Sequence, residues 1–456
     1  MPSEDIVKLE FPEHVRRRPG MYVGSLNDAS VILREAIDNS VDELYSTASD
    51  KKTKSDTIWI TNYGNKTYRV CDNGRGIPIK ESSEEGVTMA RLAVSSLNAG
   101  SKFQKTGIAI GQNGVGISCT NALSSQFEIM SRAKLQDMSL IPEELKKKLP
   151  EKINDNTYYF CYFENGLLIN EGFKDINLDE FGGQAPSTIT SFSPDKSLFR
   201  STKAYLPTSL RYVKYILTKM GKESHIYMNG KEYSESLDSF GMDIDCTIDC
   251  PEQDSINPNV RFLISFGFQK TFEKDETIGS VNGLDCGWGV HIKWAHNAFC
   301  KAFKDMFSDC RRNELMGTRM SVIALCNEPS FASQTKERLA DIDGFKASGK
   351  EEIEALAVHF RKMMRNNYDL FKQHEMRVLE YMKSTEKIGR KEMIKSTVLI
   401  AGDRSRPEAF VPNKLIDCST SNREEAELYI CEGRSASGSL VKARDPKIHA
   451  ILPLRG

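Results

Sequence analysis

The alternation of apolar and polar positions in the first part of the chain predicts a mixture of helices and strands. Between residues 30 and 44, apolar residues recur at helical spacing, which predicts an amphipathic helix. Residues 57–61 and 67–72 have the pattern of two strands around a turn at 62–65. Residues 81–113 are rich in glycine, serine and lysine and fit no single period, which indicates loops.

After about residue 205 the pattern changes. Strands are predicted at residues 223–228 and 260–266. Residues 351–387 carry apolar side chains at helical spacing and predict one long helix, whose lysines and arginines form a solvated face or meet a phosphate backbone. An apolar strand at 428–431 begins a further unit. The charged stretch at 143–154 is typical of a surface helix and loop.

Length and composition indicate a soluble protein of two or three domains. The 456 residues exceed one ordinary core, and 39% hydrophobic with 27% charged residues is a globular profile. No apolar run approaches the ~20 residues of a membrane helix, and the acidic start lacks the order of a secretory signal. We therefore expect a cytoplasmic protein without a membrane partner.

Cysteine spacing and net charge identify neither a metal site nor a nucleic-acid partner. The 11 cysteines are scattered, and the closest pair, Cys246 and Cys250, has no second pair or histidine at zinc-like spacing. They are interpreted as buried side chains in a reducing cytosol. The net charge of −1 favours no nucleic-acid partner by itself, so any DNA contact has to come from local basic faces.

The polar side of the helix at 30–44 is the first candidate site. A helical wheel places Glu35, Asp38, Asn39 and Asp42 together, opposite the apolar side chains. Any surface helix has such a face, but this one has no basic residue between Glu35 and Glu43. An amide oxygen is a suitable Mg²⁺ ligand, and a carboxylate beside it can deprotonate an attacking water.

The second candidate is the sequence Asp-Asn-Gly-Arg-Gly-Ile-Pro at residues 72–78, after a predicted strand. These residue types are common in turns. A carboxylate at the strand end can also accept a hydrogen bond from the adenine amino group, where guanine has a carbonyl. The glycines would allow the backbone to approach a flat base.

The third candidate is Gly-Gln-Asn-Gly-Val-Gly at residues 111–116, followed by a helical segment at 117–123. A glycine-rich turn that opens a helix presents unpaired N–H groups to an anion. The pattern is neither a Walker loop nor a convincing dinucleotide fingerprint. The preceding Gly-Ser-Lys-Phe, with Ser101 and Lys102, is interpreted as part of a flexible lid over a nucleotide.

Together, these motifs resemble a known ATP-binding fold. Glu-x-x-x-Asn, Asp-x-Gly-x-Gly and Gly-x-x-Gly-x-Gly, in this order, are similar to the Bergerat fold of the GHKL superfamily: gyrase, a heat-shock chaperone family, histidine kinases and MutL. The block Arg-Arg-Arg-Pro-Gly-Met-Tyr-Val-Gly at 16–24 resembles the segment ahead of the ATP helix in gyrase B and other type IIA topoisomerases.

The resemblance implies a role for each motif. Glu35 is expected to be the general base and Asn39 the Mg²⁺ ligand, while Asp72 binds adenine with support from Gly76 and Thr188. Residues expected to contact ATP are Asn39, Asp42, Asp72, Arg75, Gly76, Ile77, Pro78, Ser101, Lys102, Gly111, Gln112, Asn113, Gly114, Val115, Gly116 and Thr188. Two positions depart from the family pattern: Ser187 replaces a glycine before Thr188, and Ile110 replaces the first glycine of a Gly-Gly pair.

Ser-Gln-Thr-Lys at residues 333–336 resembles the transducer loop that reaches back to the γ-phosphate. By that resemblance Lys336 and Gln334 are catalytic, since a mobile ammonium can stabilise charge on the transferring phosphoryl group. A contact made only with a triphosphate would also couple hydrolysis to movement of one domain against another.

The last resemblance is to the opening of the TOPRIM metal domain. Residues 428–436 read Leu-Tyr-Ile-Cys-Glu-Gly-Arg-Ser-Ala, which implies that Glu432 is a metal-binding acidic residue. Arg434 stands where the family usually has aspartate. The later Asp-x-Asp and the region of the DNA-cleaving tyrosine are absent from this sequence, so either it is part of a longer chain or the enzyme is divided between polypeptides, as in T-even-like phages.

The resemblance implies an α+β protein with four parts. These are a GHKL ATPase domain at 1–204, a transducer domain with a long C-terminal helix at 205–395, a linker at 396–424 and an incomplete TOPRIM domain at 425–456.

The expected function is that of the ATP-binding and ATP-hydrolysing region of a type IIA DNA topoisomerase, bacterial or from a phage in its host. Two copies would dimerise on ATP and clamp double-stranded DNA, and other subunits would supply the rest of TOPRIM and the cleavage tyrosine. This chain alone is expected to hydrolyse ATP and not to cut DNA. The alternatives are a chaperone- or mismatch-repair-type GHKL ATPase and a nucleotide-gated DNA-binding module.

Overall fold

The computed structural model forms two compact units, Met1–Tyr381 and Met382–Gly456, and each is treated by itself. The structure describes residues 9–47, 55–64, 66–84, 86–97, 110, 114–207, 209–234, 247–249, 260–268, 276–307, 317–327, 329–332, 336–342, 349–400, 415–416, 418, 420, 422, 424–432, 440–441 and 443–454. Among these residues, no helix is long and apolar enough to cross a membrane.

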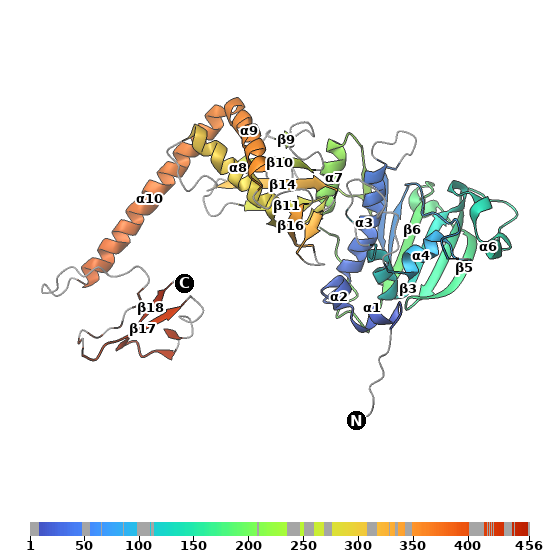
Figure 1. Ribbon diagram of the computed structural model, residues 1–456, viewed down its shortest axis with the longest axis horizontal. Helices are drawn as coiled ribbons and strands as arrows, with labels where there is room; N and C mark the ends of the chain where they lie inside the picture. Colours follow the sequence, from blue (N-terminus) through green and yellow to red (C-terminus); the bar gives the residue numbers. More distant parts are fainter. Residues whose placement is uncertain are drawn as a thin grey trace, which may run out of the picture. The chain divides into compact units, whose positions relative to one another are not determined.

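An eight-stranded sheet dominates the N-terminal half, in the order β5-β4-β3-β6-β2-β1-β7-β8 (Figure 1). Its strands are β1 (Thr57–Asn62), β2 (Tyr68–Asp72), β3 (Ser124–Arg132), β4 (Thr157–Glu164), β5 (Leu167–Asp175), β6 (Thr188–Pro194), β7 (His225–Met228) and β8 (Lys231–Glu232). All its pairs are antiparallel except β1 with β7. The sheet therefore continues past residue 204, where the sequence suggests a boundary.

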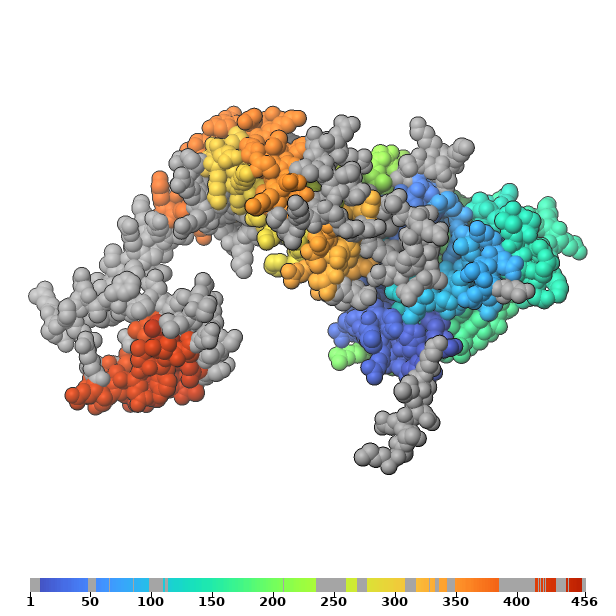
Figure 2. Space-filling model, viewed as in Figure 1, coloured from blue at the N-terminus to red at the C-terminus, as the bar shows by residue number. Residues whose placement is uncertain are grey.

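Helices cover one face of this sheet and form the main core with it. They are α1 (Glu13–Arg17), α2 (Gly20–Val23), α3 (Ser30–Ser46), α4 (Met89–Ser95), α5 (Gly116–Ala122) and α7 (Leu210–Lys219). Strand side chains alternate between the two faces. Ile58 and Val70 join the helices, whereas Trp59 and Cys71 pack on the opposite face with Phe181. In the space-filling view, α3 (blue) and β3–β5 (cyan to green) belong to one continuous body (Figure 2).

The short elements of this half lie between the strands. They are η2 (Ala133–Leu135), η3 (Met138–Leu140), α6 (Glu143–Lys146) and η4 (Asp179–Phe181). α6 and the following turn lie in the charged stretch predicted to be a surface helix and loop.

A second sheet, in the order β12-β11-β14-β10-β9, follows within the same compact unit. It is built from β9 (Thr247–Asp249), β10 (Val260–Phe268), β11 (Glu276–Val281), β12 (Leu284–Asp285) and β14 (Thr318–Cys326). A small sheet contains β13 (Trp288–Gly289), β15 (Pro329–Phe331) and β16 (Arg338–Ile342), and α8 (Val290–Met306) follows β13. Leu263, Leu284 and Ile323 extend the main core into the second sheet.

The prediction of a single helix at 351–387 is wrong, because the structure has two helices in this region. α9 (Lys350–Asn366) ends at Asn367, whose φ of −125° and ψ of 36° are not helical, and α10 (Tyr368–Ile400) then begins. The Asn367 side chain donates to the carbonyl of Met363 at 3.0 Å, and such a bond from an asparagine competes with helix continuation. The apolar pattern is hardly interrupted here, so it does not reveal the break.

In the second unit, β17 (Glu427–Glu432) and β18 (His449–Leu454) form a parallel pair. β17 contains the predicted strand at 428–431. Ile416 forms an antiparallel bridge with Ile451 beside this pair. The mixed α+β class expected from the sequence is confirmed.

Candidate nucleotide site

The helix α3 carries the first predicted group on the face turned toward α5. Glu35 is half-buried, and a Cβ added to Gly116 would overlap its carboxylate, so the acid lies directly against the first residue of α5. Asn39 donates from its Nδ2 to the Glu35 carbonyl at 3.0 Å. Thr120 of α5 donates to the carbonyl of Ile32, which fixes the two helices against each other. The carboxylate predicted as a base therefore faces the segment predicted to hold phosphates.

Asp72 occupies the buried end of β2. Its cross-strand partners are Ile58 and Thr188, so its side chain points to the helix-covered face of the sheet. Its two oxygens accept from the backbone N–H of Gly74 and the hydroxyl of Ser40, each at 3.0 Å. Thr188 also donates a side-chain hydrogen bond to it. The structure thus brings together Asp72 and Thr188, which are far apart in the sequence.

Burial of Asp72 raises the pKa of its carboxyl group to about 7. Desolvation is the largest cause, and the negative charge of Glu43 adds to it. Hydrogen bonds from Gly74, Ser40 and Thr188 act in the opposite direction. This acceptor consequently changes charge close to neutral pH.

The glycines after Asp72 meet close neighbours. A Cβ on Gly74 would overlap the side chain of Glu43, and Gly76 has a φ of +78° that favours glycine. A Cβ on Gly76 would also lie 3.1 Å from the Ser131 hydroxyl, which in turn donates to the Ile77 carbonyl at 2.7 Å. Pro78 is exposed. Glycine is therefore required at Gly76 by the backbone conformation and at Gly74 by the neighbouring side chain.

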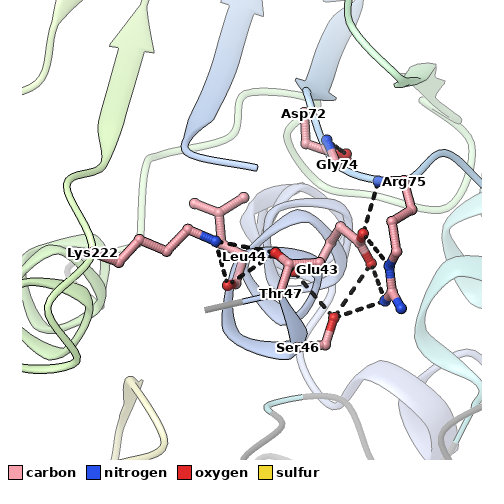
Figure 3. A network of polar contacts seen from close by, with 8 residues as sticks. All are labelled: Glu43, Leu44, Ser46, Thr47, Asp72, Gly74, Arg75 and Lys222. Atoms are coloured by element: carbon pink, nitrogen blue, oxygen red, sulfur yellow. Dashed lines mark hydrogen bonds and ion pairs between the residues drawn. The ribbon is translucent and has the colours of Figure 1, made fainter. Parts of the chain in front are cut away.

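A polar network at the C-terminal end of α3 holds this segment in place (Figure 3). Arg75 donates from its backbone N and Nε to Glu43 Oε1 and from Nη2 to Glu43 Oε2, all at 2.8 Å, and Nη2 also reaches Ser46. Lys222, from the connection between α7 and β7, donates to the Leu44 carbonyl at 3.0 Å and to Thr47 at 3.1 Å. Its ammonium therefore caps the negative end of the helix dipole.

Sequence reasoning missed Glu43 and Lys222 as parts of the site. Glu43 follows the predicted polar face of α3 and could have been found as a partner for Arg75 at the helix end. No local signal identifies Lys222, because its role depends on β7 pairing with β1.

The predicted phosphate segment is described in part. Gly114, with a φ of +60°, and Val115 precede α5, which begins at Gly116. Ser101, Lys102, Gly111, Gln112 and Asn113 lie outside the described residues, as does Gln334. The side chain of Glu432 also lies outside them, although its backbone belongs to β17.

Lys336 lies in the loop between β15 and β16. Its Nζ donates to the carbonyl of Ile110 at 3.1 Å, across 226 positions of sequence. The N–H of Ile110 donates to Asp42 Oδ1, so one residue bridges α3 and the Lys336 loop. The structure therefore brings Lys336 to the same helix as Glu35 and Asn39.

Asp38 is a buried carboxylate for which the sequence pattern predicts no role. It is 4% exposed, and its Oδ2 has no hydrogen-bond partner among the described residues. Burial and the neighbouring Glu35 raise the pKa of Asp38 to about 8, although the charges of Arg34 and Lys336 lower it. Helix α3 thus carries three acidic side chains, Glu35, Asp38 and Asp42, and the ammonium of a distant loop acts on the second of them.

The chain is similar in sequence to DNA gyrase B proteins over its whole length. The chain is 27% identical over 497 aligned residues to the DNA gyrase B protein of Thermotoga maritima, covering 100% of this chain and 70% of that protein. It is also 27% identical to the DNA gyrase B protein of Spiroplasma citri, with the same coverage. For gyrase B of Rickettsia typhi, at 26% identity, the chain spans 55% of the relative's length. No family model matches the chain.

Solved structures show the same fold. The 43K ATPase domain of Thermus thermophilus gyrase B superposes with a TM-score of 0.54 and 18% identity, covering 84% of this chain and 97% of that one. The ATPase region of Saccharomyces cerevisiae topoisomerase II gives a TM-score of 0.52 at 18% identity, covering 79% and 99%. The chain is a homologue of gyrase B. The solved structures that share its fold are ATPase regions of gyrase B and of topoisomerase II.

Proposed function

We propose that the chain is the ATP-operated clamp of a type IIA topoisomerase, closing as a dimer on double-stranded DNA. The observation that supports this most directly is that helix α3 places Glu35 against Gly116 and, through Asp42 and Ile110, is joined to Lys336 of a distant loop. Other subunits or segments would supply the cleavage tyrosine and complete the TOPRIM domain that Glu432 begins. The division between polypeptides seen in T-even-like phages is one arrangement that fits.

Each pocket residue then has a defined task. Asp72 accepts from the adenine amino group, while Gly76, Ile77, Pro78 and Thr188 shape that side of the pocket. The N-terminal turn of α5, with Gly114, Val115 and Gly116, faces the phosphates, where its unpaired N–H groups favour negative charge. Glu35 orients and deprotonates the attacking water, and Lys336 neutralises charge on the phosphoryl group.

Magnesium fits this donor set. Among the described residues, no group of three or more acidic, histidine or cysteine side chains could hold a metal ion by itself. Mg²⁺ commonly uses one or two protein oxygens together with phosphate oxygens and water, and the Asn39 amide would provide such an oxygen. When bound, it would reduce the negative charge on the phosphates.

Replacement of the proposed base tests the assignment. Glu35→Gln keeps the shape of the side chain but cannot accept the proton, so ATP turnover should fall by about 10²–10⁴-fold. Binding of a non-hydrolysable ATP analogue, measured by calorimetry, should stay within about threefold of the parent.

Glu143→Gln is the matched control, since Glu143 lies on the exposed helix α6 and pairs with Lys146. It should leave both measurements unchanged. Parental turnover in Glu35→Gln would refute the role of Glu35. Relaxation of supercoiled DNA by the chain together with its missing segments would test the topoisomerase activity as a whole.

A further inference from the structure

Ile110 occupies the junction between helix α3 and the loop that carries Lys336. It follows the predicted lid, where the family resemblance leads one to expect glycine. Its N–H donates to Asp42 on α3, and its carbonyl accepts from Lys336 on the β15–β16 loop. Both polar groups of one residue are therefore used to join two distant segments.

The side chain of Ile110 fixes this junction in the core. Ile110 is 1% exposed and belongs to the main hydrophobic cluster. A Cβ added to Gly283, in the turn between β11 and β12, would lie 3.7 Å from Ile110 Cδ1 and 2.8 Å from the Tyr45 hydroxyl. The isoleucine is thus wedged between α3 and a turn of the second sheet. A glycine at this position could make the backbone contacts but would have no side chain to hold them.

Lys336 depends on such an anchor for its direction. Its ammonium lies at the end of a flexible four-carbon stem, and its backbone has a φ of +56°. Asp38 and Asp42 of α3 face the same junction, and the charges of Asp38 and Lys336 act on each other. The Asp42 carboxylate attracts the ammonium without fixing it at one point, whereas the Ile110 carbonyl is a single, oriented acceptor.

We propose that Ile110 is a positioning residue for ATP hydrolysis, which holds the Lys336 ammonium at the phosphate side of α3 through its anchored carbonyl. The inference rests on the proposed role of Lys336. The side chain is the anchor and the carbonyl is the contact, so removing the side chain should act through Lys336. An ammonium already in place needs less rearrangement when the phosphoryl group is transferred.

A double-mutant cycle on the full chain tests this inference. Ile110→Gly should lower kcat for ATP by about tenfold while KM stays within about twofold, because the lysine is misdirected rather than removed. Lys336→Met should lower kcat by about 10²–10³-fold. The double variant should be no slower than Lys336→Met alone, since the carbonyl then has no ammonium to position. Ile110→Val should keep the anchor and restore turnover to within about twofold of the parent.

Ile141→Gly is the matched control for lost packing. Ile141 is also an isoleucine of the main core outside helices and strands, and it is 2% exposed. The variant Ile141→Gly should lower the melting temperature about as much as Ile110→Gly does. It should nevertheless keep parental kcat at a temperature where both variants are folded. If Ile110→Gly does not fold, Ile110→Ala takes its place in the cycle.

The outcomes distinguish the role of Lys336 from the role of Ile110. If Lys336→Met turns over ATP like the parent, the proposed role of Lys336 fails. If Lys336→Met is slow but the double variant is tenfold slower still, only the positioning role of Ile110 is overturned. The same holds if Ile110→Gly alone matches or exceeds parental kcat.

Discussion

At the scale of single residues, Asp72 combines burial with a proposed role, acceptor for the adenine amino group, that needs its charge. Three donors, from Gly74, Ser40 and Thr188, favour the carboxylate, but desolvation and Glu43 outweigh them and raise its pKa to about 7. This value lies above the ~3.9 of an unfolded aspartate, so the folded chain binds the proton more tightly. The free energy of unfolding from this group should therefore decrease as pH rises from ~4 through about 7.

Nucleotide affinity should change in the opposite direction, since only the ionised carboxylate is a full acceptor for the adenine amino group. Between pH 6 and pH 8 the dissociation constant of a non-hydrolysable ATP analogue should fall by up to about tenfold, with a midpoint near 7. Calorimetric titrations at several pH values would measure this.

Asp72→Asn provides the control for that titration, because it removes the ionisation of Asp72 and keeps the ionisations of Asp38 and of the ligand. This variant should bind the ATP analogue more weakly, and its dissociation constant should show no transition with a midpoint near pH 7. An equal pH profile in the parent and in Asp72→Asn would contradict the assignment of Asp72 as the adenine acceptor.

At the scale of elements, the pair α8 and α9 shows how one glycine allows two helices to approach. α9 begins after Gly349, whose φ of +53° lies in the left-handed region, and a Cβ there would overlap the indole ring of Trp294 on α8. Further along, Phe299 and Phe360 pack edge to face at 5.5 Å, and Arg361 pairs with Asp305 at 2.7 Å. The start of α9 is thus set by contact with its neighbour as well as by its own sequence.

Gly349→Ala should consequently destabilise the first unit by ~2–4 kcal/mol, combining left-handed strain with overpacking against the indole. Gly182→Ala is the control, since Gly182 has a φ of +62° and no atom within 4 Å of an added Cβ. It should cost only about 1 kcal/mol. Denaturant titrations would give both values, and equal losses in the two variants would show that the contact with Trp294 is unimportant.

Local patterns predicted elements better than they predicted junctions. The helix α3 and the strands β1 and β2 were predictable because their apolar periods are complete within the segment. The break at Asn367 was not, because a polar residue on a helix surface and one at a helix end look alike in sequence. The pairing of Asp72 with Thr188 followed from family resemblance, and the contacts of Lys222 and Ile110 had no local signal.

At the scale of the whole molecule, residues of both sheets share one core within Met1–Tyr381. Leu263, Leu284 and Ile323 belong to the same cluster as Ile58 and Val70 of the first sheet. A shared core resists separate melting of its parts, because unfolding one sheet would expose apolar surface of the other. The two sheets should therefore unfold together.

Single-tryptophan variants can test this cooperativity, as the chain has three tryptophans. Trp59 packs on the first sheet, Trp294 is buried on α8 and Trp288 is 76% exposed. In a Trp288→Phe background, variants that keep only Trp59 or only Trp294 should give the same fluorescence denaturation midpoint. Different fluorescence midpoints in the two variants, each corrected for the stability change of its own substitution, would show that the sheets unfold independently.

The strand order of the first sheet also has a consequence for biosynthesis. β6 lies between β3 and β2, although it is the last of these three strands to be made. Until residues 188–194 leave the ribosome, β1 with β2 and β3 with β4 and β5 can exist only as two separate hairpin-like pieces. Thr188 arrives on that same strand. A nascent chain therefore gains the strand that joins the two pieces, and the Thr188 partner of Asp72, in a single step.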